Sequence, residues 1–307
     1  MIRAVVFFLV SALFTESKTA FYDNPVAHFT VADSVNIEIN AIYDSLGVLS
    51  NYNAHIITPV CEEDKCYAIE VDFYWDQIGR FHHYDTVPGK GLTKLDHDPF
   101  TESDFIKLKN ILNNSNSILA SYTKEELVRN TRSSDVDGVS GATIKEIQES
   151  VINGAVYSCF TLWHIANGLA VDSLQKVTKK LFSRELIKNL VIQDDQEINY
   201  FLINSFSERD FTDYLPEILQ TILQGKGYYA KNAVEKIPSE ILSNILGQGF
   251  FATNFTRLDY FAQVAFLKKI STKSINEDLK TTLRNNVDNR NSYKNDLIKV
   301  LLDDVND

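Results

Sequence analysis

The sequence predicts two parts, an α+β domain with antiparallel strands followed by an all-α domain. Residues 67–75 alternate between apolar and polar side chains, as the residues of a half-buried strand do. After Gly168 such alternation nearly disappears, and amphipathic runs of helical period follow one another to the end of the chain. With 307 residues and 44% hydrophobic side chains, the chain can bury two cores. We expect the α+β domain to span residues 21–170 and the all-α domain residues 171–307.

The N-terminal residues 1–17 have the pattern of a signal peptide. Arg3 precedes a largely apolar run over residues 4–14, which is too short to span a bilayer. A buried N-terminal strand and an uncleaved anchor are the alternatives. We therefore expect an exported protein that is periplasmic or associated with the outer side of a membrane.

The charge balance argues against a nucleic-acid partner. The formal net charge is -11, and no basic stretch in the sequence offsets it. A surface that binds nucleic acid needs lysine and arginine side chains to neutralise phosphates.

The cysteines suggest an oxidising compartment. Cys61 and Cys66 bracket four polar residues and are close enough in sequence to form a disulfide across a tight loop. Free thiols and a metal site are the alternatives, although only His55 is near enough to be a third ligand. Cys159 falls on the apolar face of a predicted helix, where we expect a buried, unreactive thiol.

Several elements of the α+β domain follow from local patterns. Residues 35–43 alternate as a strand does, with a helix as the alternative, and residues 76–79 form the turn between strand 67–75 and a return strand over 80–84. The chain then continues into a turn at Asp98 and Pro99, a helix over residues 103–112, and a short helix to Arg129 that begins with the capping box of Thr123 and Glu126.

The all-α domain is predicted from successive amphipathic runs separated by glycine and proline. Their arrangement suggests a helical repeat of the HEAT kind, with a plain bundle as the alternative. Breaks are expected at Gly225, Gly227, Pro238, Gly247 and Gly249. The runs cover residues 181–191, 198–206, 214–223, 230–237, 241–246, 258–270 and 297–305.

A seven-residue stretch, residues 137–143, is the main functional signal. It precedes a predicted helix over residues 144–168 that Gly168 would end. Ser140 is a suitable N-cap, and the small side chains of Gly141 and Ala142 leave the first backbone N–H groups accessible to a phosphate. The alternative is a capped helix without a ligand. A serine nucleophile elbow is excluded because Ala142 stands where the second glycine of G-x-S-x-G belongs.

The same stretch resembles the flavinylation motif D-x-x-[ST]-G-A-[ST] of the covalent FMN-binding domain family. Asp137, Ser140, Gly141, Ala142 and Thr143 match all five specified positions. The family includes the C subunit of the sodium-pumping NADH:quinone reductase and the G subunit of the Rnf complex. The resemblance implies that a flavin transferase joins the phosphate of FMN to the Thr143 hydroxyl by a phosphoester bond, and that Asp137 helps to present this hydroxyl.

A second loop loosely resembles the H-x-E-T-P-G-x-G loop of the Rnf-type members of this family. Asp85 replaces the glutamate, and Val87 is inserted between Thr86 and Pro88. The resemblance implies that Thr86 and Gly89 lie near the flavin. The alternative is a plain turn that follows two exposed histidines.

The remaining polar residues of this region suggest no metal site. The candidates are His82, His83, His97, Asp85, Asp96 and Asp98. Adjacent residues on an extended chain point in opposite directions, so neighbouring pairs of this kind do not converge on one ion. We therefore expect neither a metal site nor a catalytic constellation.

Three functions follow from these observations. The first is an exported flavoprotein that relays electrons between redox partner proteins, in solution or at a membrane. The second is a secreted helical-repeat interaction or scaffold protein whose FMN-like domain holds no cofactor. The third, a reductase that acts directly on small molecules, ranks last because only His82, His83 and Tyr84 lie in a suitable loop as proton donors.

Overall fold

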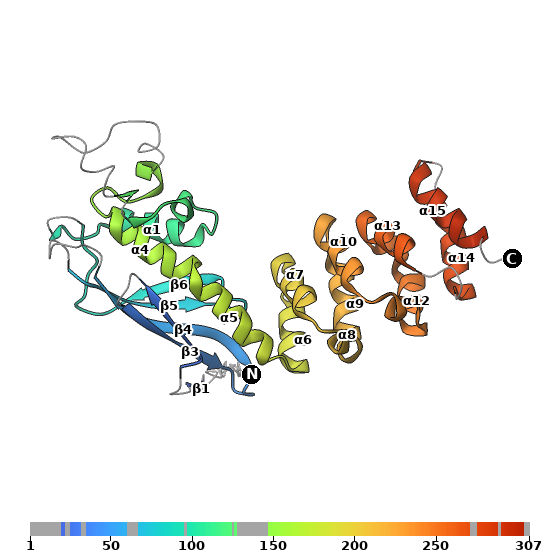
Figure 1. The fold of residues 1–307 in the computed structure, drawn as a ribbon, viewed down its shortest axis with the longest axis horizontal. Helices are drawn as coiled ribbons and strands as arrows, with labels where there is room; N and C mark the ends of the chain where they lie inside the picture. Colours follow the sequence, from blue (N-terminus) through green and yellow to red (C-terminus); the bar gives the residue numbers. More distant parts are fainter. Residues whose placement is uncertain are drawn as a thin grey trace, which may run out of the picture. The chain divides into compact units, whose positions relative to one another are not determined.

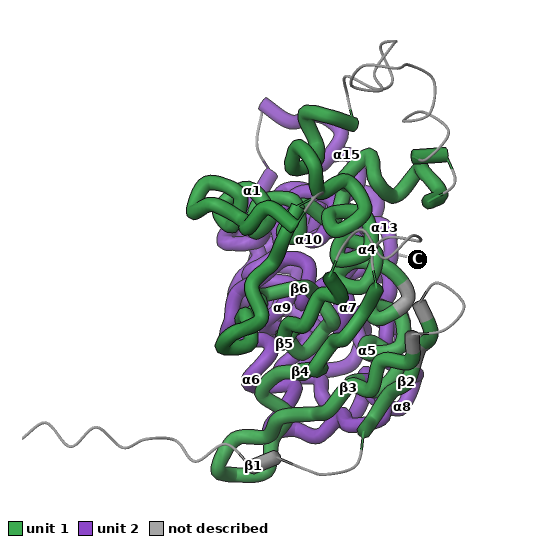
Figure 2. The backbone as a smooth tube through the Cα atoms, turned by 90° about the vertical axis from the view of Figure 1, so that its left-hand side faces the viewer, with its two compact units in different colours: residues 1–178 green, residues 179–307 purple. Residues whose placement is uncertain are grey.

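An antiparallel β-sheet and its covering helices form the first part of the chain, and helices alone form the second (Figure 1). The chain divides into two compact units, residues 1–178 and 179–307 (Figure 2). This division lies a few residues after the boundary expected near residue 170. The computed structural model describes residues 20–21, 25–31, 35–59, 67–94, 97–124, 126–127, 147–270, 275–287 and 290–303.

The sheet of the first unit is antiparallel throughout the described residues. Its order is β1-β3-β4-β5-β6, and β2 also pairs with β3. The expected strand over residues 35–43 and the expected hairpin are confirmed as β3 and as β5 with β6. The strands are β1 (Ala20–Phe21), β2 (Ala27–Val31), β3 (Val35–Tyr43), β4 (Leu49–Thr58), β5 (Ile69–Trp75) and β6 (Phe81–Thr86).

One face of this sheet is buried beneath two consecutive helices, α4 (Val156–Asn167) and α5 (Leu169–Lys180) (Figure 1). Alternate residues of β5 point inward and are fully or nearly fully buried. Trp75 donates its indole N–H to the carbonyl of Ala166 at 2.9 Å, so its polar atom is satisfied inside the core. The hydroxyl of Tyr52 on β4 likewise meets that of Thr178 at 2.6 Å.

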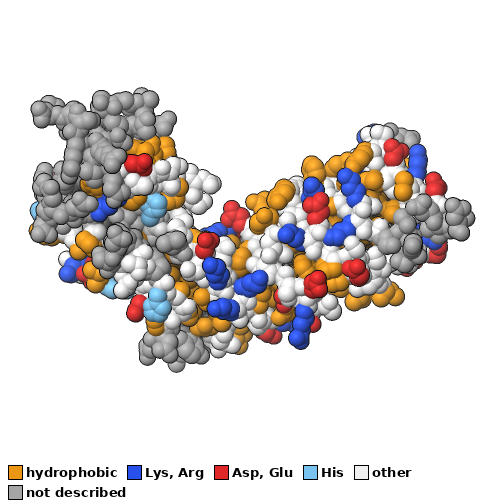
Figure 3. Space-filling model, in the orientation of Figure 1, with side chains coloured by type: hydrophobic (Ala, Val, Ile, Leu, Met, Phe, Trp, Pro, Cys, Tyr) orange, Lys and Arg blue, Asp and Glu red, His pale blue; other side chains and the backbone are white. Residues whose placement is uncertain are grey.

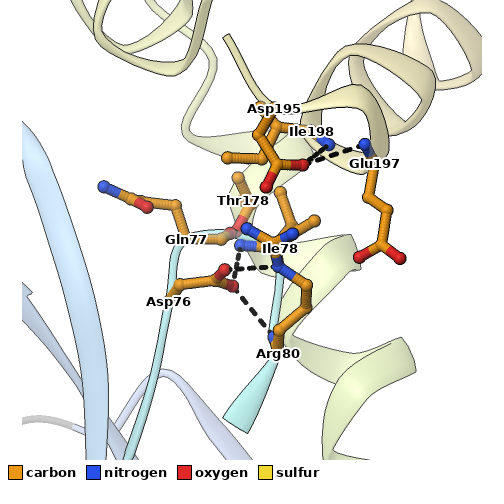
Figure 4. A network of polar contacts seen from close by, with 8 residues as sticks. All are labelled: Asp76, Gln77, Ile78, Arg80, Thr178, Asp195, Glu197 and Ile198. Carbon is orange, nitrogen blue, oxygen red and sulfur yellow. Dashed lines mark hydrogen bonds and ion pairs between the residues drawn. The ribbon is translucent and has the colours of Figure 1, made fainter. Parts of the chain in front are cut away.

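The turn between β5 and β6 packs against α5. Asp76 accepts hydrogen bonds from the backbone N–H groups of Ile78 and Arg80, and its second oxygen pairs with the Arg80 side chain at 2.6 Å (Figure 4). Gly79 adopts a φ of +80°, and a β-carbon there would lie 3.1 Å from the Cβ atom of Leu174. Both its backbone angle and its close approach to α5 therefore require glycine.

Helix α1 (Glu102–Asn113) and the following short 3-10 helix (Ile118–Ser121) are tied to α4 through backbone carbonyls. Trp163 donates to the carbonyl of Asn114 at 2.8 Å, and Asn167 donates to that of Leu112 at 2.9 Å. These bonds satisfy carbonyls at the C-terminal end of α1, which lack partners within the helix. The expected helix over residues 103–112 is thereby confirmed.

The expected single helix over residues 144–168 is wrong. Residues 147–150 are helical, the chain then turns at Gly154 with a φ of +75°, and α4 begins at Val156. A left-handed glycine interrupts the run of helical angles even though the apolar spacing continues across it. Gly168 does end α4, but its φ of -95° is not that of a left-handed cap, and α5 starts at the next residue.

The second unit is all-helical in the residues described. The N-cap side chain of Asp195 accepts from the backbone N–H groups of Glu197 and Ile198 and starts α7 (Figure 4). The longer helices are α6 (Arg184–Ile192), α7 (Gln196–Ser205), α9 (Leu215–Gln224), α10 (Gly227–Lys236), α12 (Ile245–Asn254), α13 (Tyr260–Lys269), α14 (Glu277–Asn285) and α15 (Ser292–Asp303). Three shorter pieces connect them: α8 (Glu208–Asp213), α11 (Ser239–Ser243) and a 3-10 turn (Phe255–Arg257).

The expected breaks in this unit are only partly correct. Gly225, Gly227 and Pro238 lie at helix ends, as predicted. Gly247 and Gly249 instead lie inside α12. A β-carbon at Gly247 would come within 2.4 Å of the carbonyl oxygen of Ile241, so this glycine allows α12 to pack against α11.

The longer helices of the second unit form two sets. Helix α10 packs against α7 and α13, and α13 against α15, while α9 packs against α6 and α12, and α12 against α14. Hydrogen bonds join successive helix pairs: Asn204 donates to Asn232, and the backbone of Asn276 donates to Gln248. One core of aromatic and aliphatic side chains runs from Ile203 to Leu301. No helix in the described part of the chain has the length and apolar character needed to cross a membrane.

We predict that Gly168→Ala destabilises the first unit. A β-carbon at Gly168 would lie 2.4 Å from the carbonyl oxygen of His164, so the last turn of α4 would have to change its backbone conformation. We expect a loss of roughly 2–3 kcal/mol in the free energy of unfolding. Both tryptophans of the chain, Trp75 and Trp163, lie in this unit, so urea unfolding followed by tryptophan fluorescence reports on it alone.

The matched control is Gly91→Ala, because no atom lies within 4 Å of a β-carbon built there. This variant should stay within about 0.5 kcal/mol of wild type. Equal stabilities for the two variants would contradict the close approach at Gly168.

Candidate functional site

The loop that follows β6 is a tight turn with defined geometry. The N–H of Lys90 donates to the carbonyl of Val87 at 3.0 Å, Pro88 is the second residue, and Gly89 is the third with a φ of +80°. These features are those of a type II turn, which favours glycine at its third position. Thr86 is the last residue of β6 and is exposed. A turn is therefore present at this position, with the inserted Val87 as its first residue, and its expected proximity to a flavin stays a prediction.

The chain after this turn is held close to the start of α1. Thr93 and Pro99 form an isolated β-bridge, and the N–H of Phe100 donates to the carbonyl of Leu92 at 2.9 Å. Thr101 and Asp104 form a capping box at the N-terminus of α1. Asp98 and Pro99 lie in this bridged segment and do not form the predicted turn, while the helix expected after them is present as α1.

Asp104 is a carboxylate in this segment whose ionised form is stabilised by hydrogen bonds. It accepts from the backbone N–H of Thr101 at 2.8 Å, from the Thr101 hydroxyl at 2.7 Å and from the ammonium of Lys94 at 3.0 Å. The hydrogen bonds from Thr101, followed by that from Lys94, lower the pKa of Asp104 to about 2. The segment between the turn and α1 is thus fixed by a charged group.

The flavinylation-like motif lies outside the described residues, and so do both cysteines of the expected disulfide. This applies to Asp137, Ser140, Gly141, Ala142, Thr143, Cys61 and Cys66. The described residues that flank the motif, Leu127 and Ile147, are both buried. Further along the chain, the backbone N–H of Ile152 donates a hydrogen bond to the sulfur of Cys159 at 3.4 Å. The chain on each side of the motif is therefore packed into the first unit.

Cys159 and Tyr84 bring β6 close to this flanking chain. Cys159 on α4 is fully buried, and burial raises the pKa of its thiol to about 11. Tyr84 points inward from β6, and burial, together with the nearby Cys159, raises the pKa of its hydroxyl to about 12. Both groups are therefore neutral near pH 7, which confirms the expected unreactive thiol. Cys159 is thus close to Tyr84 on β6 and to Ile152 in the chain after the motif.

The histidines of this region are separated into two places. His97 has a φ of +64°. Its ring packs against that of Tyr67, with the two ring centroids 4.1 Å apart. His82 and His83 lie instead on β6, and their Nδ1 atoms are 2.6 Å apart. Histidine side chains are visible on the surface of the first unit (Figure 3). Among the residues described, no group of three or more histidine, cysteine or acidic side chains has the arrangement of a metal site.

The pairing of His82 with His83 was not expected from the sequence. His83 stacks on Tyr74 with ring centroids 4.3 Å apart and planes 4° from parallel. Burial is the main cause that lowers the pKa of His83, and the proximity of His82 lowers this pKa further. Only the adjacency of two histidines in a strand rich in aromatic residues signals this pair in the sequence.

We predict that Asp104→Asn lowers the free energy of unfolding of the first unit by about 1 kcal/mol at pH 7, because it weakens a capping box. The ordinary pKa of this carboxyl is 3.8, and its folded pKa is about 2. Its contribution is therefore complete above pH 4 and is lost as the pH falls towards 2. Urea unfolding at pH 7 and pH 3, followed by tryptophan fluorescence, should show the wild-type advantage shrink at pH 3.

Glu102→Gln is the control, because Glu102 is an exposed carboxylate in the same helical turn. Its effect should be small at both pH values. A wild-type advantage over Asp104→Asn that does not change with pH would contradict the assigned ionisation.

No family model, curated protein or solved structure matches the chain. The resemblance to covalent FMN-binding domains therefore rests on the sequence motif and on the chemistry of the residues around it.

Proposed function

We propose that the first unit is a covalent FMN-binding domain and that the protein is an exported flavoprotein that relays electrons between redox partners. The observation that carries this proposal is the complete match of residues 137–143 to the flavinylation motif. Five specified positions in so short a stretch make the motif specific, although it covers a small part of the chain.

The arrangement of the described residues supports this proposal. Cys159 lies close both to Tyr84, on the strand that leads into the Gly89 turn, and to Ile152, in the chain that follows the motif. Thr86 is exposed, and Gly89 has no atom within 4 Å of a built β-carbon, so a ligand can approach the backbone there. We assign Thr86 and Gly89 to the non-covalent part of the flavin site.

Thr143 is the attachment residue on this proposal. Its Oγ1 forms a new bond to the phosphorus of FMN and loses its proton, while the transferase expels the group previously bonded to that phosphorus. Free FMN has no such leaving group, so the donor is a flavin dinucleotide whose second nucleotide leaves with the bonding electrons. When bound, FMN supplies one- and two-electron redox chemistry, and the protein supplies its position and surroundings.

Export and covalent attachment are consistent with each other. Residues 1–17 have the pattern of a signal peptide, and outside the cytoplasm a dissociated FMN would not be replaced. A phosphoester keeps the cofactor on the chain. The maturation partner is a flavin transferase, and the working partners are redox proteins, in solution or at the membrane.

The second unit is, on this proposal, a helical repeat that docks a redox partner. Its helix pairs begin at Arg184, Leu215, Ile245 and Glu277, an interval of about 30 residues. Aromatic side chains are exposed on three successive helices of one set: Tyr200 on α7, Tyr228 on α10 and Tyr260 on α13. Figure 3 shows hydrophobic side chains along this unit. Exposed tyrosines of this kind are common at protein interfaces.

We predict that wild-type protein, exported together with a flavin transferase, gives a fluorescent band on a denaturing gel. Thr143→Ala should give a dark band, since no hydroxyl is left to esterify. Thr143→Ser should stay fluorescent, because the motif accepts serine at this position. Thr86→Ala should also stay fluorescent, because Thr86 is assigned to non-covalent contacts.

A dark wild-type band with unchanged mass would contradict the flavoprotein assignment. It would favour a secreted helical-repeat scaffold whose first unit holds no cofactor. A fluorescent Thr143→Ala band would instead place the attachment on another residue.

A further inference from the structure

A β-bulge in β6 directs two adjacent histidines to the same side of the sheet. In the pairing of β5 with β6, Tyr74 is opposite His83 and Trp75 is opposite Phe81, so His82 has no partner residue. An extra residue of this kind changes the direction of the side chains around it. Tyr74 lies between the inward-facing Phe73 and Trp75, so Tyr74 and the stacked His83 belong to the outer face. His82 joins them there, with its ring centroid 4.8 Å from that of His83.

The two imidazoles face one another through their Nδ1 atoms, 2.6 Å apart. Two bare nitrogen lone pairs repel at this distance, so the space between them holds either a shared proton or a cation. Nitrogen ligands lie about 2.0–2.1 Å from Zn²⁺, so two imidazoles on one ion have nitrogen atoms roughly 3 Å apart. The rings need only a small rotation to widen the gap to that distance.

The surroundings suit a divalent ion. Stacking on Tyr74, with ring planes 4° from parallel, fixes the orientation of the His83 ring. Asp85 is the next outward residue of β6, and it is opposite Asp72 in the register. These two carboxylates add negative charge near the pair, and Lys109 on α1 opposes them.

We propose that His82 and His83 form a bidentate site for a divalent ion of the Cu²⁺ and Zn²⁺ class, with water completing the coordination. Imidazole is a preferred ligand of both ions, and among the first-row divalent ions Cu²⁺ binds such sites most strongly. No metal site was expected from the sequence, because neighbouring residues on an extended chain point in opposite directions. At the bulge His82 and His83 lie on the same side of the sheet, so this reason does not apply to them. The proposal is independent of the flavin and of Thr143.

The test is Cu²⁺ titration of the untagged full-length chain, produced without a flavin transferase and followed by electron paramagnetic resonance. Wild type should bind one Cu²⁺ tightly, with hyperfine splitting from two imidazole nitrogens. His82→Asn and His83→Asn keep a polar atom near the Nδ1 position, but each removes one imidazole. Each should weaken binding roughly tenfold or more and leave one imidazole nitrogen in the spectrum.

His28→Asn is the matched control, because His28 is an exposed histidine on β2. It should bind Cu²⁺ as wild type does. In a parallel experiment, Zn²⁺ should shift the histidine side-chain NMR signals of His82 and His83 and leave that of His55 in place. Equal Cu²⁺ affinity for wild type and the His82→Asn/His83→Asn double variant would overturn the proposal and leave a shared proton as the occupant.

Discussion

The packing of the sheet's aromatic inner face against α4 is the constraint on which the first unit depends. Trp75 and Phe73 are fully buried in this interface, and the Trp75 indole is tied to the carbonyl of Ala166. A buried indole N–H without a partner would cost free energy, so this bond fixes where α4 lies along β5. With α4 fixed, Trp163 and Asn167 position the end of α1, and Cys159 faces Tyr84 on β6.

This packing also sets the framework of the proposed flavin site. The two sequence features that resemble FMN-binding domains are more than 40 residues apart in the chain. Their neighbouring described residues meet through β6 and α4, because Tyr84 and Ile152 both approach Cys159. Burial raises the pKa of both the Cys159 thiol and the Tyr84 hydroxyl, so both groups pack here in their neutral forms near pH 7. On the proposed function, electron transfer would depend on the cofactor and on the partner, and the chain would hold and shield the flavin.

The outer face of the same sheet differs in chemistry from the inner one. His55, Asp72 and Asp85 lie across three neighbouring strands, and His55 pairs with Asp72 at 2.8 Å. The bulge at His82 adds a third imidazole to this polar face, beside those of His55 and His83. One sheet therefore presents an apolar side that organises the helices and an opposite side rich in imidazole and carboxylate groups.

The sequence by itself determined the strands with regular alternation, the capping box of Thr123 and Glu126, the turn at Gly89 and the all-helical second unit. In these segments local spacing and backbone preference agree with the final structure. Tertiary structure decided the rest. Strand β4, which contains serine, asparagine and histidine, exists because it pairs with β3 and β5. The outward pair of His82 and His83 depends on a change of register between β5 and β6. The break at Gly154 depends on a left-handed backbone angle, and the helical Gly247 on the close packing of α11 against α12. Local periodicity contains none of these.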